Sequence, residues 1–174
     1  MSAPDWAIRL ARPDDAAALP AIERSAAGAF ADEPGLAFLA NADPIEEPRH
    51  RRLIARGHCL VAEHGGAPVG FLSTEPFSRE LHIAEFSVHP DYQGKGIGAV
   101  LLRAIGIDAK NSGFAALTLT TFADVPWNGP FYARHGFETV SDLDAHPRLK
   151  ARIEQEMQHG LPRERRIAMI LFLD

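Results

Sequence analysis

The sequence predicts an α/β fold of the α+β kind, in which one mixed, mostly antiparallel and twisted sheet of about seven strands is flanked by helices. Two local signals support this prediction: a glycine pair between two short apolar runs, which is typical of a β-hairpin, and a helical apolar period that follows a strand and a glycine-rich loop. The 174 residues, 46% apolar and 24% charged, suffice to bury one core. We therefore expect a single domain over residues 1–174.

The N-terminal third alternates between strand and helix signals. Residues 6–12, WAIRLAR, alternate apolar and polar side chains as a half-buried strand does. Pro13 suits the first turn of a helix that Pro34 breaks, and a weaker helix signal covers residues 45–56. The residues that the first of these helices is expected to bury are Ala17, Leu19 and Ile22.

A three-stranded antiparallel meander is expected next. Gly65 and Gly66 separate two apolar runs, which predicts a hairpin. The expected strands are 59–63, 69–74 and 81–88. After Gln93 the apolar period becomes helical, and Gly113 is the expected end of that helix. Its predicted buried stripe is Ile97, Val100, Leu101, Ala104 and Ile105.

The C-terminal part continues with short elements and shows no internal repeat or linker. The expected elements are a buried strand at 115–121, a short helix from Pro126 through Arg134, a strand at 137–140, an amphipathic helix within 142–165 and a last strand at 167–173. The amphipathic helix is predicted from Leu149, Ile153 and Met157, which recur at four-residue steps.

Composition and charge exclude several classes of protein. A net charge of −5 and a pI near 5.9 argue against a nucleic-acid-binding surface. The N-terminus lacks a signal-peptide pattern and no apolar run is long enough to cross a bilayer, so no membrane contact is expected. The single cysteine, Cys59, excludes an internal disulfide and favours a cytoplasmic protein. No histidine falls in a metal-ligand spacing, so no metal is expected.

The most informative segment is the loop QGKGIG at residues 93–98. The first amides of a helix have no backbone acceptor and lie at the positive end of its dipole, so a phosphate binds well there, and glycines let it approach closely. Gly96 follows Lys95 where a Walker A loop needs Ser or Thr, which excludes that nucleotide site. The glycine spacing and the preceding hairpin also disagree with a dinucleotide fingerprint. A tight turn that only caps the helix is the structural alternative.

Gln93, Gly96 and Gly98 instead match Q-x-x-G-x-G, which resembles the acyl-CoA loop of the GCN5-related N-acetyltransferase (GNAT) superfamily. The order of the predicted elements is similar to that family throughout the chain. The resemblance implies an N-acetyltransferase domain with acetyl-CoA as cosubstrate, whose pantetheine arm pairs along residues 86–88. The cofactor-binding residues that it implies are Phe86, Ser87, Val88, Gln93, Gly94, Lys95, Gly96, Ile97, Gly98 and Asn128.

The downstream segment VPWNGPFYARHGFE resembles the second half of the same family's site, with Asn128 and Tyr132 followed by Gly136 and Phe137. The spacing from Asn128 to Tyr132 is shorter than the family's commoner pattern, and an N-cap role is the alternative for Asn128. A phenol of pKa about 10 near the thioester sulfur can protonate the leaving thiolate, so Tyr132 is the candidate general acid. Aromatic packing is its alternative role.

The base is expected on the strand before the loop, because an amine of pKa about 10 must lose a proton before it attacks. Glu85 is the candidate, since a charge inside an apolar strand is hard to explain structurally, and a surface ion pair is its alternative role. His82 is the alternative base, and strand alternation places it on the opposite face unless a bulge intervenes. Proton loss through ordered water also stays open. The resemblance further implies an oxyanion-binding amide near Val88, which requires that this strand splay from the next.

The family builds its acceptor pocket from two segments, here approximately residues 30–47 and 142–165. Their acids are Asp32, Glu33, Asp43, Glu46, Glu47, Asp142, Asp144, Glu154 and Glu156, an acidic rim that favours a cationic acceptor such as a polyamine or an amino sugar. Met157 and Leu161 are candidates for a pocket wall or a homodimer face. The expected activity is direct acetyl transfer to a small primary amine in a ternary complex. The alternatives are acetylation of a protein N-terminus or lysine, and a non-catalytic CoA sensor.

Overall fold

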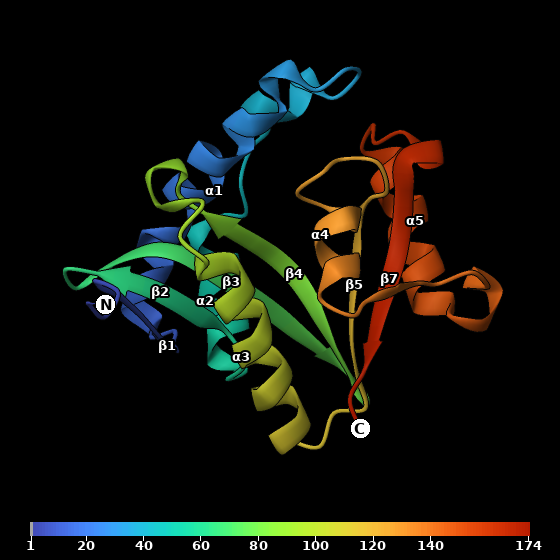
Figure 1. Ribbon diagram of the computed structural model, residues 1–174. Helices are drawn as coiled ribbons and strands as arrows, with labels where there is room; N and C mark the ends of the chain where they lie inside the picture. The colour runs from blue at the N-terminus through green and yellow to red at the C-terminus, as the bar shows by residue number, and fades with distance from the viewer. Residues whose placement is uncertain (1) are drawn as a thin grey trace.

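A computed structural model describes residues 2–174 and shows a seven-stranded mixed sheet of order β1-β2-β3-β4-β5-β7-β6 (Figure 1). The strands are β1 Trp6–Leu10, β2 Leu60–His64, β3 Ala67–Phe77, β4 Glu80–Val88, β5 Ala116–Phe122, β6 Glu138–Thr139 and β7 Arg166–Phe172. The α-helices are α1 Leu19–Ala27, α2 Glu47–Ala55, α3 Ile97–Asn111, α4 Gly129–Arg134 and α5 Pro147–Gln158. Within the described residues, β4 and β5 pair in parallel and the other neighbouring strands are antiparallel. The predicted fold class is confirmed.

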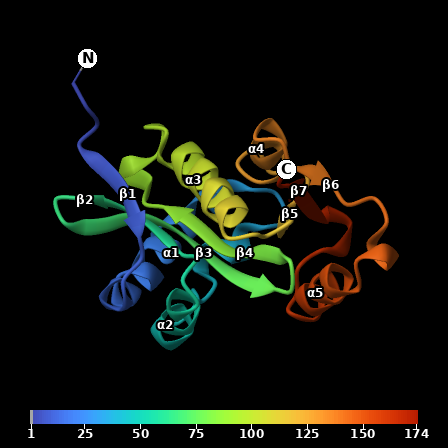
Figure 2. The same cartoon turned by 90° about the horizontal axis from the view of Figure 1, so that it is seen from below.

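Helices cover both faces of the sheet: α3 and α4 lie on one face, and α1 and α2 on the other (Figure 2). α3 buries Leu101 and Ile105 in the larger core, while α1 and α2 bury Leu19 and Leu53 against Phe71 of β3. Each such side chain stabilises the fold by about 1.5–3 kcal/mol, so these cores hold the helices firmly relative to β4. Within residues 2–174, no helix combines the length and the apolar character that a bilayer crossing requires.

The β2–β3 hairpin and α3 lie where the sequence predicts them. Gly65 and Gly66 have φ angles of 58° and 82°, a region that glycine enters without a steric penalty, and they close the predicted turn. α3 ends two residues before Gly113, as expected. The amphipathic helix is also present as α5, although Met157, predicted on its apolar stripe, is exposed.

The first helical segment differs from the prediction. Residues Pro13–Ala17 form a 3₁₀ helix, and α1 begins only at Leu19. Because the 3₁₀ turn holds fewer residues than an α-turn, the buried side of this segment moves by one position. Ala16 is therefore buried, and Ala17, which was predicted to be buried, is exposed.

A β-bulge in β4 changes which side chains share a face. In the β3–β4 register Ser73 pairs with Glu85 and Thr74 pairs with Ile83, so Ala84 is an extra residue on β4. An extra residue reverses the alternation beyond it. His82 and Glu85 therefore point to the same face, which is the exception to strand alternation that a bulge allows.

The strands β4 and β5 diverge soon after they meet. Their parallel pairing covers only three residue pairs, from Glu80 with Ala116 to His82 with Thr118. Beyond His82 the two strands separate into a V, which Figure 1 shows in green and gold. The splay that the family resemblance requires is thus present, and it opens the sheet along the second half of β4.

Candidate active site

A cavity of about 1130 Å³ lies where β4 and β5 separate. Pockets for a single ligand are typically about 300–1,000 Å³, so this cavity is slightly larger than that range. The cavity is lined by the glycine loop, the open half of β4, the end of β5 with α4, α1 with the segment that leads into α2, α5 and the start of β7. Segments more than a hundred residues apart therefore meet in one cavity.

The glycine loop presents unpaired amides to the cavity. Gly94 and Gly96 have φ angles of 76° and 85°, a conformation that a side chain would strain. The Gln93 side-chain amide donates to the Val88 carbonyl at 2.9 Å and ties the loop to the end of β4. Among residues 2–174, the backbone amides of Gly94, Lys95 and Gly96 donate to no acceptor.

The amides that begin α3 extend this anion-binding surface. Ile97, Gly98 and Ala99 occupy the first turn of α3, where a helix has no internal acceptors for its amides. The helix has 15 residues, so its dipole adds a partial positive charge at this end. The surface formed by residues 94–99 suits a phosphate or diphosphate group.

The open edge of β4 offers further backbone donors. His89 N donates to Val69 O at 2.8 Å, and antiparallel bonding alternates along a strand. The amides of Phe86 and Val88 therefore face away from β3, toward the opening between β4 and β5. The Phe86 amide is occupied, since it donates to Glu85 Oε1 at 3.1 Å. The Val88 amide remains directed at the cavity.

The short helix α4 carries the predicted Asn128 and Tyr132. A Cβ on Gly129 would come within 3.0 Å of the carbonyl oxygens of Phe122 and Ala123, so only glycine allows α4 to sit this close to β5. Asn128 precedes the helix, but its Oδ1 accepts from Thr121 Oγ1 at 2.8 Å rather than capping it. Asn128 and Tyr132 both line the cavity.

Tyr132 combines packing with an environment that holds its proton. Its ring lies among Phe86, Phe131 and Phe137, with centroid distances of 6.3, 5.4 and 5.6 Å. Burial, and next the charge of Glu85, raise the pKa of the Tyr132 phenol above its ordinary value. The phenol therefore stays protonated at neutral pH.

Glu85 faces the cavity from the bulged part of β4. Its Oε1 accepts from the Phe86 amide and from Ser87 Oγ at 3.2 Å. Burial raises the pKa of the Glu85 carboxyl above its ordinary value, while these hydrogen bonds and two arginines oppose the shift. The net effect is a carboxyl that accepts a proton more readily than an exposed one.

A second carboxylate, Glu23 of α1, lies in the same cavity and was missed by the sequence reasoning. Its two oxygens accept from the Ile45 amide at 3.2 and 3.0 Å, which fixes the segment before α2. Burial, followed by the charge of Glu85, raises the pKa of Glu23 to about 8. Its signal in the sequence was faint: it is the one acid of α1, next to the buried Ile22.

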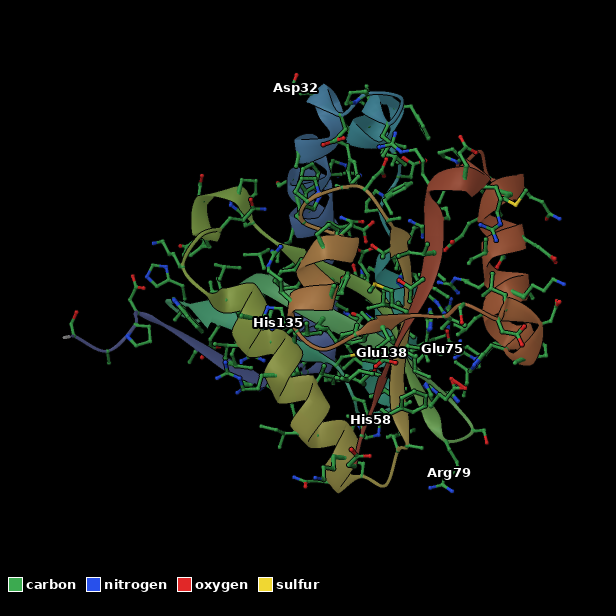
Figure 3. The ribbon with its side chains drawn as sticks, turned by 45° about the vertical axis from the view of Figure 1, so that its right-hand side comes forward. Asp32, His58, Glu75, Arg79, His135 and Glu138 are labelled. Carbon is green, nitrogen blue, oxygen red and sulfur yellow. The ribbon has the colours of Figure 1, made fainter. Side chains whose placement is uncertain are left out.

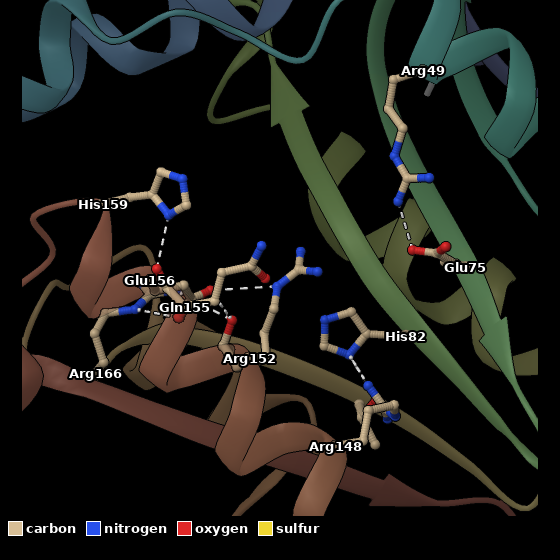
Figure 4. Close-up of polar contacts among 11 residues, drawn as sticks. Arg49, Glu75, His82, Arg148, Arg152, Gln155, Glu156, His159 and Arg166 are labelled. Atoms are coloured by element: carbon tan, nitrogen blue, oxygen red, sulfur yellow. Dashed lines mark hydrogen bonds and ion pairs between the residues drawn. The ribbon is translucent and has the colours of Figure 1, made fainter.

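His82 does not line the cavity, among the residues that the structure describes. It is buried under the sheet, where its Nδ1 is 2.9 Å from Thr118 Oγ1 and 3.2 Å from Arg148 Nη1 (Figure 4). Burial, then the charges of Arg152 and Arg148, lower the pKa of His82 to about 3. The bulge brings its ring to the same face as Glu85, but its hydrogen bonds serve the β4–β5 junction.

The acceptor side of the cavity is formed by the two segments that the sequence indicated. Phe30, Leu39 and Asp43 line it from the first segment, and Arg152, Gln155, Glu156, His159 and Leu161 line it from the second. The expected acidic rim is wrong: among the described residues, only Asp43 and Glu156 of the nine candidate acids line the cavity. Asp32, for example, is at the outer tip of its segment (Figure 3). Acids in these loops are mostly solvated.

Three arginines also line the cavity: Arg49 of α2, Arg152 of α5 and Arg166 of β7. Arg166 donates to Glu156 Oε1 through Nε and Nη2 at 3.1 and 3.0 Å, and its guanidinium lies 4.5 Å from the Phe122 ring centre. The basic runs at residues 49–52 and 163–166 were expected to be solvated faces, and Arg152 was not considered, because the tertiary fold alone brings α2, α5 and β7 to one cavity.

Comparison with known proteins agrees with the acyl-CoA loop that the sequence predicted. A family model described as "Acetyltransferase (GNAT) domain" matches residues 55–139. These residues include the glycine loop, α3, β5 and α4. The GNAT resemblance that the loop motif predicted is thus confirmed over residues 55–139.

Similar proteins differ in how much of the chain they match. "Amino-acid acetyltransferase" of Shewanella oneidensis is 30% identical over 97 residues, which cover 54% of this chain and 20% of that protein. The chain thus spans about a fifth of the length of the curated relatives it matches.

Solved structures match the chain over nearly its whole length. The PaiA N-acetyltransferase of Thermoplasma acidophilum, solved in complex with coenzyme A, has a TM-score of 0.71 at 16% identity, covering 99% of both chains. The Escherichia coli ribosomal-protein-S18-alanine N-acetyltransferase has a TM-score of 0.66 at 20% identity, covering 97% of this chain and 94% of its own. The two structural likenesses establish the fold.

Proposed function

We propose that this protein is an acetyl-CoA-dependent N-acetyltransferase that transfers the acetyl group to a small primary amine by direct attack in a ternary complex. One observation carries the proposal: a single cavity joins a surface of unpaired amides to a carboxyl group and a phenol. The name of the Shewanella relative supports a small-molecule amine as the acceptor.

The cofactor side of the cavity fits coenzyme A in charge and shape. The amides of residues 94–99 suit the diphosphate, and Lys95 adds an exposed positive charge beside them. The open edge of β4 at residues 86–88 suits an extended pantetheine arm, which can bond to backbone groups as an added strand does. We assign Asn128 to the same side, because its side chain lines the cavity next to Tyr132.

Proton transfer in this proposal belongs to two groups. An ordinary carboxylate is mismatched with an amine by roughly six pKa units, or about 8 kcal/mol, and the raised pKa of Glu85 narrows that gap. The neighbouring Glu23, whose pKa is raised to about 8, holds a further proton in the same pocket. Tyr132 keeps its proton until it can deliver it to the departing sulfur. In this proposal the Val88 amide stabilises the oxyanion that develops at the carbonyl of the acetyl group.

The proposal is tested by calorimetric titration of acetyl-CoA, followed by thiol release from acetyl-CoA with polyamines, aminoglycosides, amino acids and peptides. We expect saturable binding and thiol release with at least one small amine. Release with peptides alone would favour acetylation of a protein N-terminus or lysine. Binding without any release would favour a CoA sensor, and no binding would overturn the proposal.

A further inference from the structure

The acceptor side of the cavity contains a guanidinium that the fold leaves without a hydrogen bond. Of the three arginines that line the cavity, Arg166 donates to Glu156 and Arg49 donates to Glu75 at 2.6 Å. Within residues 2–174, Arg152 donates no hydrogen bond. Its Nε forms an ion-pair contact with Glu156 Oε2 at 3.7 Å (Figure 4).

Glu156 has little capacity left for Arg152. Its Oε1 accepts two bonds from Arg166, and its Oε2 accepts from Thr120 Oγ1 at 2.7 Å. The Arg152 side chain is 33% exposed, so most of it is withdrawn from water. A guanidinium carries five donors, and a partly desolvated cation without a full set of acceptors favours binding of an anion.

Arg152 and the candidate base share the cavity. Glu85 lines it from β4 and Arg152 lines it from α5, on the far side of the β4–β5 opening. An acceptor between them meets a proton-accepting carboxyl on one side and an anion-binding guanidinium on the other. A molecule with an amine and a carboxylate close together satisfies both, because arginine binds carboxylates through paired, charge-assisted bonds.

We infer that the acceptor is an amino acid, whose carboxylate Arg152 binds while its amine faces Glu85. This inference rests on the proposed transferase function and names the residue that sets its specificity. Arg152 lies outside residues 55–139, which match the family model, so its assignment depends on this chain's own α5. It also replaces the cationic acceptor that an acidic rim would favour, since a polyamine would meet Arg49 and Arg152 as like charges.

The test compares each of several L-amino acids with its own amide, which keeps the amine and removes the carboxylate. Phenylalanine, methionine, leucine and alanine form suitable pairs. For the wild-type protein we expect kcat/KM to be at least about tenfold higher for the acids. Arg152→Gln should raise KM for the acids by about tenfold to a hundredfold and leave the amides and acetyl-CoA within about twofold. Arg152→Lys should recover part of the loss.

Lys150→Gln is the matched control, because Lys150 is an exposed cation on the same helix that pairs with Asp144 and lies outside the cavity lining. Its kinetics should equal those of the wild type. Equal turnover of acids and amides, or equal losses for both in Arg152→Gln, would overturn the inference while leaving the transferase proposal intact. The proposed function itself fails if acetyl-CoA does not bind, or if no acceptor leads to thiol release from acetyl-CoA.

A binding measurement decides the inference independently of turnover. The CoA-saturated protein is titrated with the same amino acids and amides by calorimetry, for the wild type and for Arg152→Gln. The inference is supported if the wild-type complex binds an amino acid but not its amide, and if Arg152→Gln no longer binds that amino acid. If no amino acid binds the wild-type complex, the inference is wrong.

Discussion

The two sides of the cavity are built differently. On the cofactor side, formed by the glycine loop, the open edge of β4 and α4, the defining contacts are local: Gln93 bonds Val88 five residues back, and Asn128 bonds Thr121 seven residues back. On the acceptor side, formed by residues 30–47 and α5, the contacts join distant segments. Glu23 bonds residue 45, and Thr120 bonds Glu156. The cofactor side can therefore be recognised from short motifs, whereas the acceptor side exists only in the folded chain.

The largest effect is expected where the two sides meet. Glu85→Gln and Tyr132→Phe should each lower kcat by about 10²–10⁴-fold, because each removes a group that moves a proton. The affinity for acetyl-CoA should change little, since the diphosphate surface is untouched. Steady-state kinetics and calorimetry measure both quantities. If both variants turned over at the wild-type rate, neither residue would take part in proton transfer. The reaction would then not occur where we place it, between the cofactor side and the acceptor side.

Low pH should lower the free energy of unfolding through a buried histidine of α2, the helix that follows the acceptor-side segment 30–47. Burial, then the charge of Arg49, lowers the pKa of His50 to about 4, and both ring nitrogens of this buried residue lack partners among the described residues. The unfolded chain therefore binds a proton near pH 6.5 and the folded protein only near 4. The free energy of unfolding should be highest above pH 6.5 and should fall by about 2–3 kcal/mol between 6.5 and 4 because of this group.

Urea denaturation at several pH values measures this loss. His50→Phe, which keeps a ring against Phe71, should flatten the slope between pH 6.5 and 4 relative to the wild type. An unchanged slope in the variant would show that His50 does not titrate in this way. His82 contributes in the same direction and remains in both proteins, so the difference between them isolates His50.

The cofactor side should respond to charge at the glycine loop. Gly96→Asp places a carboxylate beside the diphosphate surface and should weaken acetyl-CoA binding by about tenfold to a hundredfold, since it also strains a backbone with a φ of 85°. Gly113→Asp is the matched control, because Gly113 has a φ of 86° and open space at the other end of α3. Equal calorimetric affinity in the two variants would contradict the role of the loop.

The smallest expected effect is on the packing of α4 against β5. Gly129→Ala should lower the free energy of unfolding by about 1–3 kcal/mol, because its Cβ meets two backbone carbonyl oxygens that cannot yield easily. Gly106→Ala in α3, where a Cβ has open space, should instead stabilise the protein by about 0.5–1 kcal/mol. Thermal or chemical denaturation distinguishes them, and a neutral Gly129→Ala would mean that α4 is free to move outward.

Agreement between sequence and structure follows the range of the interactions. The hairpin at Gly65 and Gly66, the helix after the glycine loop and the amphipathic α5 were predictable because backbone conformation and apolar period are local properties. The 3₁₀ start before α1 was not, since its pattern differs from an α-helical one by a single position. The buried Glu23 was missed for another reason: its environment comes from β4 and residue 45, far along the chain.

The amino-acid sequence alone predicted an α/β fold of about seven strands and the glycine loop at residues 93–98 that we propose binds a diphosphate. Glycines with positive φ, a tight turn and repeating apolar positions act within a few residues of themselves. Packing and strand register settled the rest: the bulge at Ala84 that turns Glu85 and His82 to one face, the splay of β4 from β5, and the arginines that line the cavity. These features arise between segments that are remote in the chain, where no local pattern records which partners will meet.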